Sequence, residues 1–218
     1  MSHERFHYKS LEEVKEKEAE LGVNLPFAED TRILSEPLKV RSHVFPNRLG
    51  IAPMEGADSL PDGSPSAYTI RRYVNEAIGG SAVIWFEAIS IVEEGRSSKT
   101  QLFLNKDNLE QYKAFTAKIK DAGMKANGYA PYLIMQANHS GRYSNPDNKP
   151  APMIAYRHPE LEKYREADDS CIVSDDYLKH LEEKFGEAAK LSKEAGFDAI
   201  DIKSCHGYLL AELSSAYT

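Results

Sequence analysis

The stretch SAYTIRRYVNEAIGGSAVIWFE, residues 66–87, decides the fold class predicted for this chain. Its first part predicts a helix that ends in the pair Gly79 and Gly80, because glycine commonly terminates helices. The apolar run AVIWF at 82–86 then predicts a short buried strand, and the polar Glu87 follows it directly. The repeating unit is therefore a helix, a strand and a polar group just past the strand.

The same unit occurs again downstream. A helix opened by Asp107, with Glu110 three residues later as in a capping box, is predicted to end at Gly123. The strand PYLIM at 131–135 follows, and the polar Gln136 comes next.

A third copy begins at Ser174, a predicted helix N-cap, and its helix is predicted to stop at Gly196. The strand FDAIDI at 197–202 follows, with Lys203 just beyond it. LGIAP at 49–53 supplies an opening strand. Four strands that alternate with helices predict βαβ units and a parallel sheet.

A doubly wound sheet and a (β/α)8 barrel both satisfy this pattern. No GxGxxG motif follows any predicted strand and no GxxxxGK[ST] motif occurs, which disfavours a nucleotide-binding doubly wound fold. Polar residues instead follow the C-terminal end of every predicted strand, where a barrel carries its active site. A closed barrel needs eight strands and roughly 250 residues. The α/β pattern of residues 39–218 therefore predicts about the first half of a TIM barrel, with a loop or lid over 140–172.

Residues 1–38 are predicted to form an N-terminal helical leader that acts as a packing arm. Ser10 can cap a short helix whose apolar positions fall on one stripe. The segment LKVRSHVFPNRL at 38–49 is compatible with a short hairpin.

Composition limits the partners that this chain can have. Its 27 Lys and Arg against 34 Asp and Glu give a net charge of −7, which disfavours nucleic acid and anionic membranes as the main partners. The charged N-terminus shows neither a signal peptide nor a membrane span. Cys171 and Cys205 form no CxxC pair and no disulfide framework, so a reducing compartment such as the cytoplasm is predicted. These limits favour an enzyme or binding domain for a small molecule.

Three groups of polar residues after predicted strands carry candidate chemistry. Gln136 offers a donor and an acceptor, which suits the edge of a heterocycle with alternating C=O and N–H groups. Nearby His139 and Arg142 are either functional or structural, with Arg142 in the second case tying down a carboxylate or a carbonyl. Glu55, after the opening strand, is either a catalytic carboxylate or an ion-pair partner of Arg48 or Lys203.

The cluster DIKSCHGYLL at 201–210 combines Lys203, His206 and Tyr208. Two donors that face one point can bind an oxyanion, and a phenol can protonate a carbanion. These residues make a poor metal site, because only the histidine is a common ligand, so no metal is predicted. A nucleophile pair of Cys205 with His206 is disfavoured, because adjacent residues need not face each other.

Together these segments resemble the old yellow enzyme family of FMN-dependent oxidoreductases, in particular its NADH:flavin oxidoreductase and dienoyl-reductase-like branch. The matching segments are NRLGIAPM at 47–54, WFEA at 85–88, QANHSGRYS at 136–144 and AGFDAIDIKSCHGYLL at 195–210. The resemblance implies a (β/α)8 barrel that holds FMN at its C-terminal mouth. It also implies reduction of an activated alkene of the enone or enoate type, with hydride passed from NADH or NADPH through the flavin.

The resemblance assigns a role to each matching position. The flavin-contacting positions are Ala52, Pro53, Met54, Glu55, Ala88 and Gln136. Lys203 with His206 corresponds to the pair that binds the substrate's oxygen, and Tyr208 to the tyrosine that protonates the α-carbon. Lys203 stands where the family usually has His, and its point charge is expected to favour a more anionic oxygen. Glu55 stands where many members have Cys or Thr.

The resemblance leaves several questions open. Later strands would carry the phosphate site of FMN, and the cysteines of a 4Fe-4S cluster would lie beyond residue 218, so the cluster remains undetermined. One alternative is a non-flavin barrel enzyme, such as an aldolase, that uses Lys203 as a Schiff-base nucleophile. Another is a truncated, non-catalytic half-barrel, which is expected to form a homo-oligomer that covers its open edges.

Overall fold

A computed structural model describes residues 5–28 and 30–215, which divide after Leu34 into two compact units. The first unit contains helix α1 (Leu11–Leu21). The hydroxyl of Ser10 caps this helix by accepting a hydrogen bond from the backbone N–H of Glu13, so the predicted leader helix and its cap are confirmed. The short 3-10 helix η1 (Arg32–Ser35) spans the division between the units.

The second unit begins with the predicted hairpin. Strands β1 (Leu38–Val40) and β2 (His43–Phe45) pair antiparallel, with Leu38 opposite Phe45. Arg41 adopts a φ of +53° in the turn between them. The hairpin prediction is confirmed.

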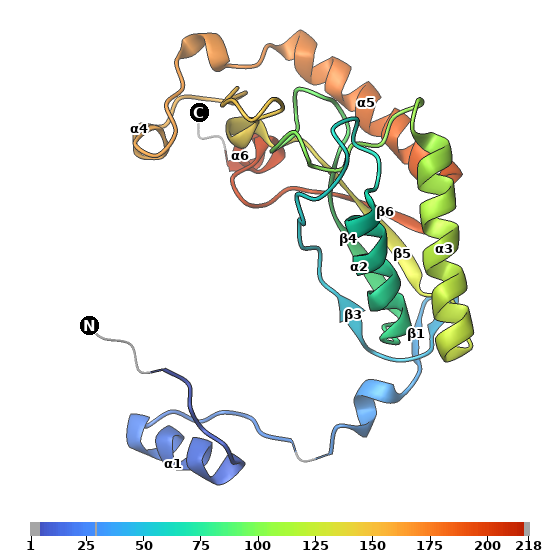
Figure 1. The fold of residues 1–218 in the computed structure, drawn as a ribbon. Coiled ribbons are helices and arrows are strands. Elements are labelled where there is room, and N and C mark those ends of the chain that lie inside the picture. The colour runs from blue at the N-terminus through green and yellow to red at the C-terminus, as the bar shows by residue number, and fades with distance from the viewer. Residues whose placement is uncertain (1–4, 29, 216–218) are drawn as a thin grey trace. The chain divides into compact units, whose positions relative to one another are not determined.

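Four parallel strands follow in the order β3-β4-β5-β6 (Figure 1). They are β3 (Gly50–Ile51), β4 (Val83–Ser90), β5 (Tyr132–Asn138) and β6 (Ala199–Ile202). Each pair of neighbours is joined through a helix, which is the βαβ arrangement that the sequence predicts. Strand β4 and strand β5 extend further than predicted, so that Glu87 and Gln136 lie within the sheet.

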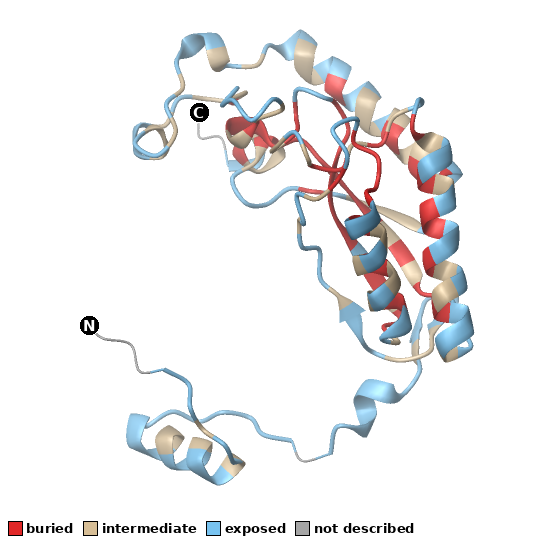
Figure 2. Cartoon of the chain, in the orientation of Figure 1, coloured by how far each residue is buried: buried red, intermediate tan, exposed pale blue. Residues whose placement is uncertain are grey.

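Three helices cover one face of this sheet: α2 (Ala67–Ile78), α3 (Leu109–Asn127) and α5 (Asp175–Glu194) (Figure 1). Buried residues gather between these helices and the sheet (Figure 2). The core includes Tyr73, Ile84, Phe86, Tyr112, Phe115, Ile119, Leu133, Met135, Leu181 and Ala188. The opposite face, here called the open face, carries the chain's single tryptophan, Trp85, which is 37% exposed.

The start and the end of α3 differ from the prediction. Its N-cap is Asn108, without a side-chain cap, so the predicted capping box of Asp107 and Glu110 is wrong. The amide oxygen of Asn108 instead accepts the backbone N–H of Asn105 and so closes the preceding turn. The helix also continues through Gly123 to Asn127. The glycine is explained by packing and not by a helix end, because a Cβ there would approach the Cδ of Pro131 to 2.6 Å.

The predicted loop over 140–172 contains three short helices: η2 (Gly141–Tyr143), α4 (Pro159–Glu162) and η3 (Asp169–Cys171). Gly141 has a φ of +58°, and a Cβ at this position would overlap the backbone of Leu209, at the start of α6 (Leu209–Ser215). Arg142 donates to the Glu212 carboxylate at 2.6 Å, with both side chains almost fully buried. Of the two roles left open for Arg142, the structure therefore supports the structural one.

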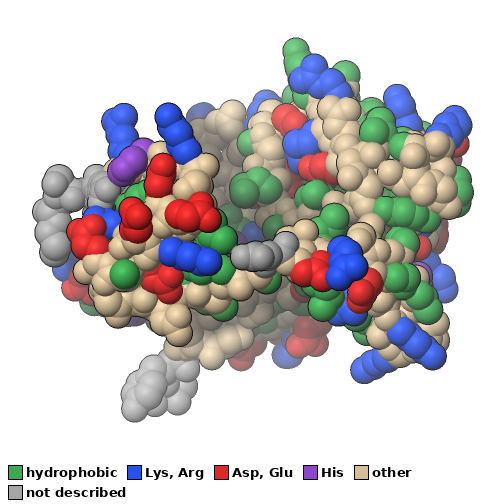
Figure 3. Space-filling view, turned by 90° about the horizontal axis from the view of Figure 1, so that it is seen from below, with side chains coloured by type: hydrophobic (Ala, Val, Ile, Leu, Met, Phe, Trp, Pro, Cys, Tyr) green, Lys and Arg blue, Asp and Glu red, His purple; other side chains and the backbone are tan. Residues whose placement is uncertain are grey.

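Basic and acidic side chains are interspersed on the face drawn in Figure 3, with hydrophobic side chains between them. Within residues 5–28 and 30–215, no helix is long and apolar enough to cross a membrane.

Candidate active site at the carboxyl ends of the strands

An irregularity in β4 determines which side chains face the site. Trp85 pairs with Ile134 and Ala88 pairs with Gln136, so β4 carries one more residue than β5 between these two pairs. Such a bulge re-aims the side chains that follow it. Phe86 and Glu87 both turn toward α2, and Ala88 reaches the open face opposite Gln136.

Glu87 is buried and acts as the acceptor at the centre of a polar network. Its Oε1 accepts from Arg72 at 2.6 Å and from the hydroxyl of Tyr73 at 3.1 Å. Its Oε2 accepts the backbone N–H of Gly56 at 3.0 Å, which ties the segment after β3 to the sheet. A Cβ at position 56 would overlap the Arg72 guanidinium, so a side chain there would displace Arg72 from this network. The sequence placed Glu87 at a strand end but did not predict this role.

The segment tied down by Glu87 carries four of the predicted flavin-contacting residues. Ala52, Pro53 and Met54 are exposed just past β3, and the Met54 side chain is 75% exposed. Glu55 is half-buried and accepts a hydrogen bond from the hydroxyl of Ser97. Burial raises the pKa of the Glu55 carboxyl, and the charge of Lys203 opposes that rise.

Of the two ion-pair partners predicted for Glu55, neither forms a salt bridge with it in the described residues. Arg48 lies 3.9 Å from Glu36 instead. Lys203 acts on Glu55 only through its longer-range charge.

One row of residues crosses three strands on the open face. Ala88 of β4 pairs with Gln136 of β5, which pairs with Asp201 of β6. The amide nitrogen of Gln136 donates to Asp201 Oδ2 at 2.8 Å, which orients the amide. A charged residue within the apolar strand FDAIDI is the sequence signal that indicates such a polar partner, and the sequence-based prediction did not include Asp201.

The turn after β6 brings the three predicted catalytic residues together. His206 and Gly207 both have positive φ, +62° and +65°, and the N–H of Tyr208 closes the turn on the carbonyl of Cys205 at 3.2 Å. The Lys203 ammonium lies 4.6 Å from the centroid of the Tyr208 ring, and the ring of His206 lies 6.1 Å from that ring. A left-handed conformation at the non-glycine His206 is unusual and keeps the turn tight.

The protonation state of Tyr208 and the orientation of the His206 ring follow from their neighbours in this turn. Burial, followed by the nearby Glu55 charge, raises the pKa of Tyr208 to about 12, so the residue is a phenol at neutral pH. The Sγ of Cys205 lies 3.2 Å from His206 Nδ1, so these adjacent residues do face each other, contrary to the argument from adjacency. This contact leaves Nε2 of His206 as the nitrogen available to a ligand.

His139, the other candidate after β5, is buried within a hydrogen-bonded chain. Its Nδ1 accepts the backbone N–H of Gly141 and its Nε2 lies 2.9 Å from the Tyr177 hydroxyl, which donates to Glu94. Burial lowers the pKa of His139 to about 4. His139 is therefore a neutral structural group at neutral pH.

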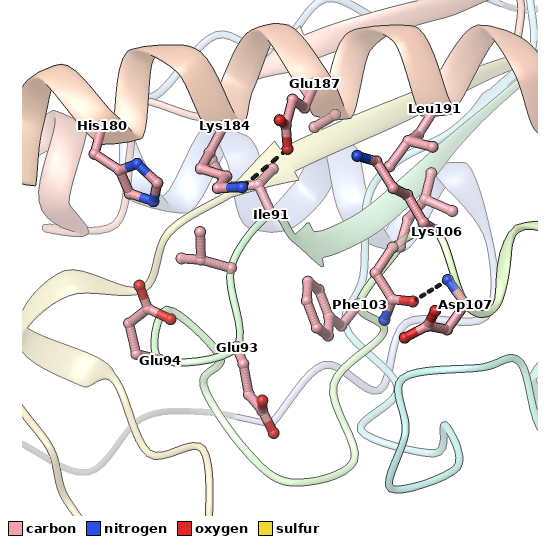
Figure 4. A pocket seen from close by; sticks show the side chains of 14 residues that line it. Ile91, Glu93, Glu94, Phe103, Lys106, Asp107, His180, Lys184, Glu187 and Leu191 are labelled. Carbon is pink, nitrogen blue, oxygen red and sulfur yellow. Dashed lines mark hydrogen bonds and ion pairs between the residues drawn. The ribbon is translucent and has the colours of Figure 1, made fainter.

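A separate pocket of about 430 Å³ lies between α5 and the segment 91–107 that follows β4 (Figure 4). From α5 it is lined by His180 and by Lys184, whose Nζ lies 2.9 Å from Glu187. No predicted site residue lines it. Its acidic and basic side chains favour no single class of ligand, and the described residues contain no cluster of His, Cys, Asp and Glu suited to a metal ion.

The match to a known family begins close to the boundary between the two compact units of the chain, which lies after Leu34. The family model described as "NADH:flavin oxidoreductase / NADH oxidase family" matches residues 33–218. The chain is 28% identical over 186 residues to the NADPH dehydrogenase of Bacillus velezensis, covering 84% of this chain and 52% of that protein. The corresponding protein of Bacillus subtilis is 27% identical over the same coverage. The chain spans about half the length of the curated relatives it matches.

Solved structures with this fold are (β/α)8 barrels, of which the chain again covers about half. An old yellow enzyme from a Pichia species aligns with a TM-score of 0.66 at 21% identity, over 82% of this chain and 47% of that one. Morphinone reductase in complex with tetrahydroNAD aligns with a TM-score of 0.65 at 20% identity, over 81% and 50%. The predicted partial TIM barrel is therefore confirmed. By the family model that spans most of its length, the chain belongs to the NADH:flavin oxidoreductase / NADH oxidase family, whose members use FMN and NAD(P)H.

Proposed function

We propose that this chain provides the flavin-facing and proton-donating residues of an FMN-dependent oxidoreductase that reduces an activated alkene, of the enone or enoate type, with NADH or NADPH. The observation that carries the proposal is the juxtaposition at the end of β6. An ammonium, an imidazole and a phenol lie on one tight turn, beside the oriented amide of Gln136.

The donor set on the open face fits FMN. Gln136 keeps its amide oxygen and a second N–H for the C=O and N–H groups of a flavin edge, because only one of its N–H groups is used by Asp201. Ala88, opposite Gln136, carries only a Cβ, so a flat ring can approach the sheet there. The exposed backbone of Ala52 and Pro53 faces solvent past β3. When bound, FMN would accept hydride from NAD(P)H and supply it to the β-carbon of the alkene.

The residues of the β6 turn would act on the alkene itself. Lys203 and Nε2 of His206 would donate to the oxygen conjugated with the alkene and draw electron density away from the β-carbon. Tyr208 would give its proton to the α-carbon, so that the hydride and this proton together add one hydrogen to each alkene carbon. The pKa of Tyr208, about 12, means that the proton is present at neutral pH.

Glu55 would lie beside the flavin, at a place where burial raises the pKa of its carboxyl. Glu55 and Met54 would shape the ring's surroundings.

The experiment begins with the purified chain, loaded with FMN, desalted and assayed for flavin absorbance per chain. Alkene reduction by NADH and by NADPH is then compared among the wild type, Lys203→Ala and His206→Ala. Both substitutions are expected to abolish most turnover while flavin retention stays unchanged. Normal turnover in both variants would refute the role given to this pair.

We also infer a small-molecule substrate and a reducing compartment such as the cytoplasm. Both cysteines, Cys171 and Cys205, are free thiols, which is the usual state in such compartments. Self-association that covers the open edges of the sheet is also proposed, and the mass of the chain in solution by light scattering tests it.

A further inference from the structure

Lys203 brings a positive charge into the site without a counterion. Its side chain follows Asp201 by two residues, so both lie on the open face of the sheet. The residue is 8% exposed, and none of the described carboxylates lies within 4.0 Å of its Nζ. Its Nζ lies over the face of the Tyr208 ring, 4.6 Å from the ring centroid.

A buried charge is unfavourable unless an opposite charge or several hydrogen bonds compensate it. The contact with an aromatic face compensates a lysine only in part. The site is therefore incomplete electrostatically, and an anion at this point would complete it.

Neither of the two carboxyl groups on this side of the site forms an ion pair with Lys203 in the described residues. Asp201 accepts the amide of Gln136. Glu55 accepts the hydroxyl of Ser97.

We propose that Lys203 binds a carboxylate that is conjugated with the alkene of the substrate, so that this site prefers enoates to enones. The inference rests on the proposed function. One carboxylate oxygen would take the Lys203 ammonium and the other would take Nε2 of His206, with the Tyr208 ring as the wall beside them. A free carboxylate activates an alkene weakly because of its negative charge, and an adjacent ammonium offsets that charge.

The test uses a matched pair of probes, trans-2-hexenoate and trans-3-hepten-2-one, in which a methyl group replaces one carboxylate oxygen. Dissociation constants are measured by ligand-observed NMR on the full chain, with and without FMN. Lys203→Met is expected to weaken hexenoate binding about tenfold more than heptenone binding, a factor that corresponds to 1.4 kcal/mol, because the ketone loses one donor whereas the carboxylate also loses its opposite charge. Lys203→Arg, which keeps the charge, is expected to retain the preference for hexenoate.

Lys125→Met, which removes an exposed lysine from α3, is the matched control and should change neither constant. Heptenone binding that the Lys203→Met variant retains also shows that this variant is folded. Equal weakening of both probes, or hexenoate binding that is insensitive to Lys203, would overturn the inference. Failure to retain FMN would instead count against the proposed function, because the comparison of the two probes does not need the flavin.

Discussion

Replacing Glu87 by glutamine removes a buried charge that holds three groups at once. The carboxylate accepts Arg72 and Tyr73 through one oxygen and the Gly56 N–H through the other. Glutamine has a single acceptor oxygen, so either Arg72 or Gly56 loses its partner. Arg72 is 29% exposed and keeps Asp58 at 3.1 Å, which moderates the loss.

Glu87→Gln is expected to lower the free energy of unfolding by roughly 3 kcal/mol. This value lies between the effect of losing one hydrogen bond to a charged group and the effect of breaking a fully buried ion pair. For a chain of this length that corresponds to a fall in Tm of about 6–12 °C. Thermal and urea unfolding of the variant measure the change. Because Gly56 anchors the segment that bears Met54 and Glu55, FMN retention should fall as well.

Glu110→Gln is the matched control, because it removes an equal charge from an exposed pair with Lys113. Its Tm should stay close to that of the wild type. If Glu87→Gln shifts Tm no more than Glu110→Gln does, the network around Glu87 does not stabilise the fold and the reasoning is refuted.

Three further predictions follow from buried groups. Burial holds the pKa of His139 near 4, below its unfolded value near 6.5, so the free energy of unfolding should fall by up to roughly 3 kcal/mol as the pH drops through that window. Urea unfolding at several pH values in this window should show a steeper fall for the wild type than for His139→Asn, and equal pH dependence of the two would contradict the assignment. Glu212→Gln leaves Arg142 charged and buried and should cost roughly 3–5 kcal/mol in urea unfolding, whereas an unchanged midpoint would show that the pair is dispensable. Tyr208→Phe should lower the rate of alkene reduction by about 10²–10⁴-fold with FMN retention intact. Stopped-flow oxidation of the reduced flavin by the alkene measures this rate, and a normal rate in the variant would contradict the role given to Tyr208.

The sheet could be predicted because its strands are short apolar runs bounded by helix signals, and their order follows from right-handed βαβ connections. The start of α3 was predicted incorrectly because Asp107 and Glu110 have the spacing of a capping box. The helix instead begins after Asn108, whose side chain bonds the backbone of Asn105 in the preceding turn. The end at Gly123 was predicted incorrectly because close packing on Pro131, which no local pattern reveals, also requires glycine.

The site could be predicted only in outline. Strand-end positions pointed to Gln136 and to the turn that carries Tyr208, because polar groups past parallel strands meet at one edge. The bulge that turns Glu87 toward α2 could not be foreseen, since it depends on cross-strand register and not on the local sequence. The pairing of Arg142 with Glu212 likewise joins residues far apart along the chain.

Binding of FMN to the open face, at the carboxyl ends of the strands, can be measured directly. Trp85 is the only tryptophan in the sequence and lies on that face, so quenching of its fluorescence on titration with FMN reports binding. We expect saturable quenching at about one FMN per chain, weakened by Gln136→Leu. Absence of saturable quenching, or quenching that Gln136→Leu leaves unchanged, would contradict it.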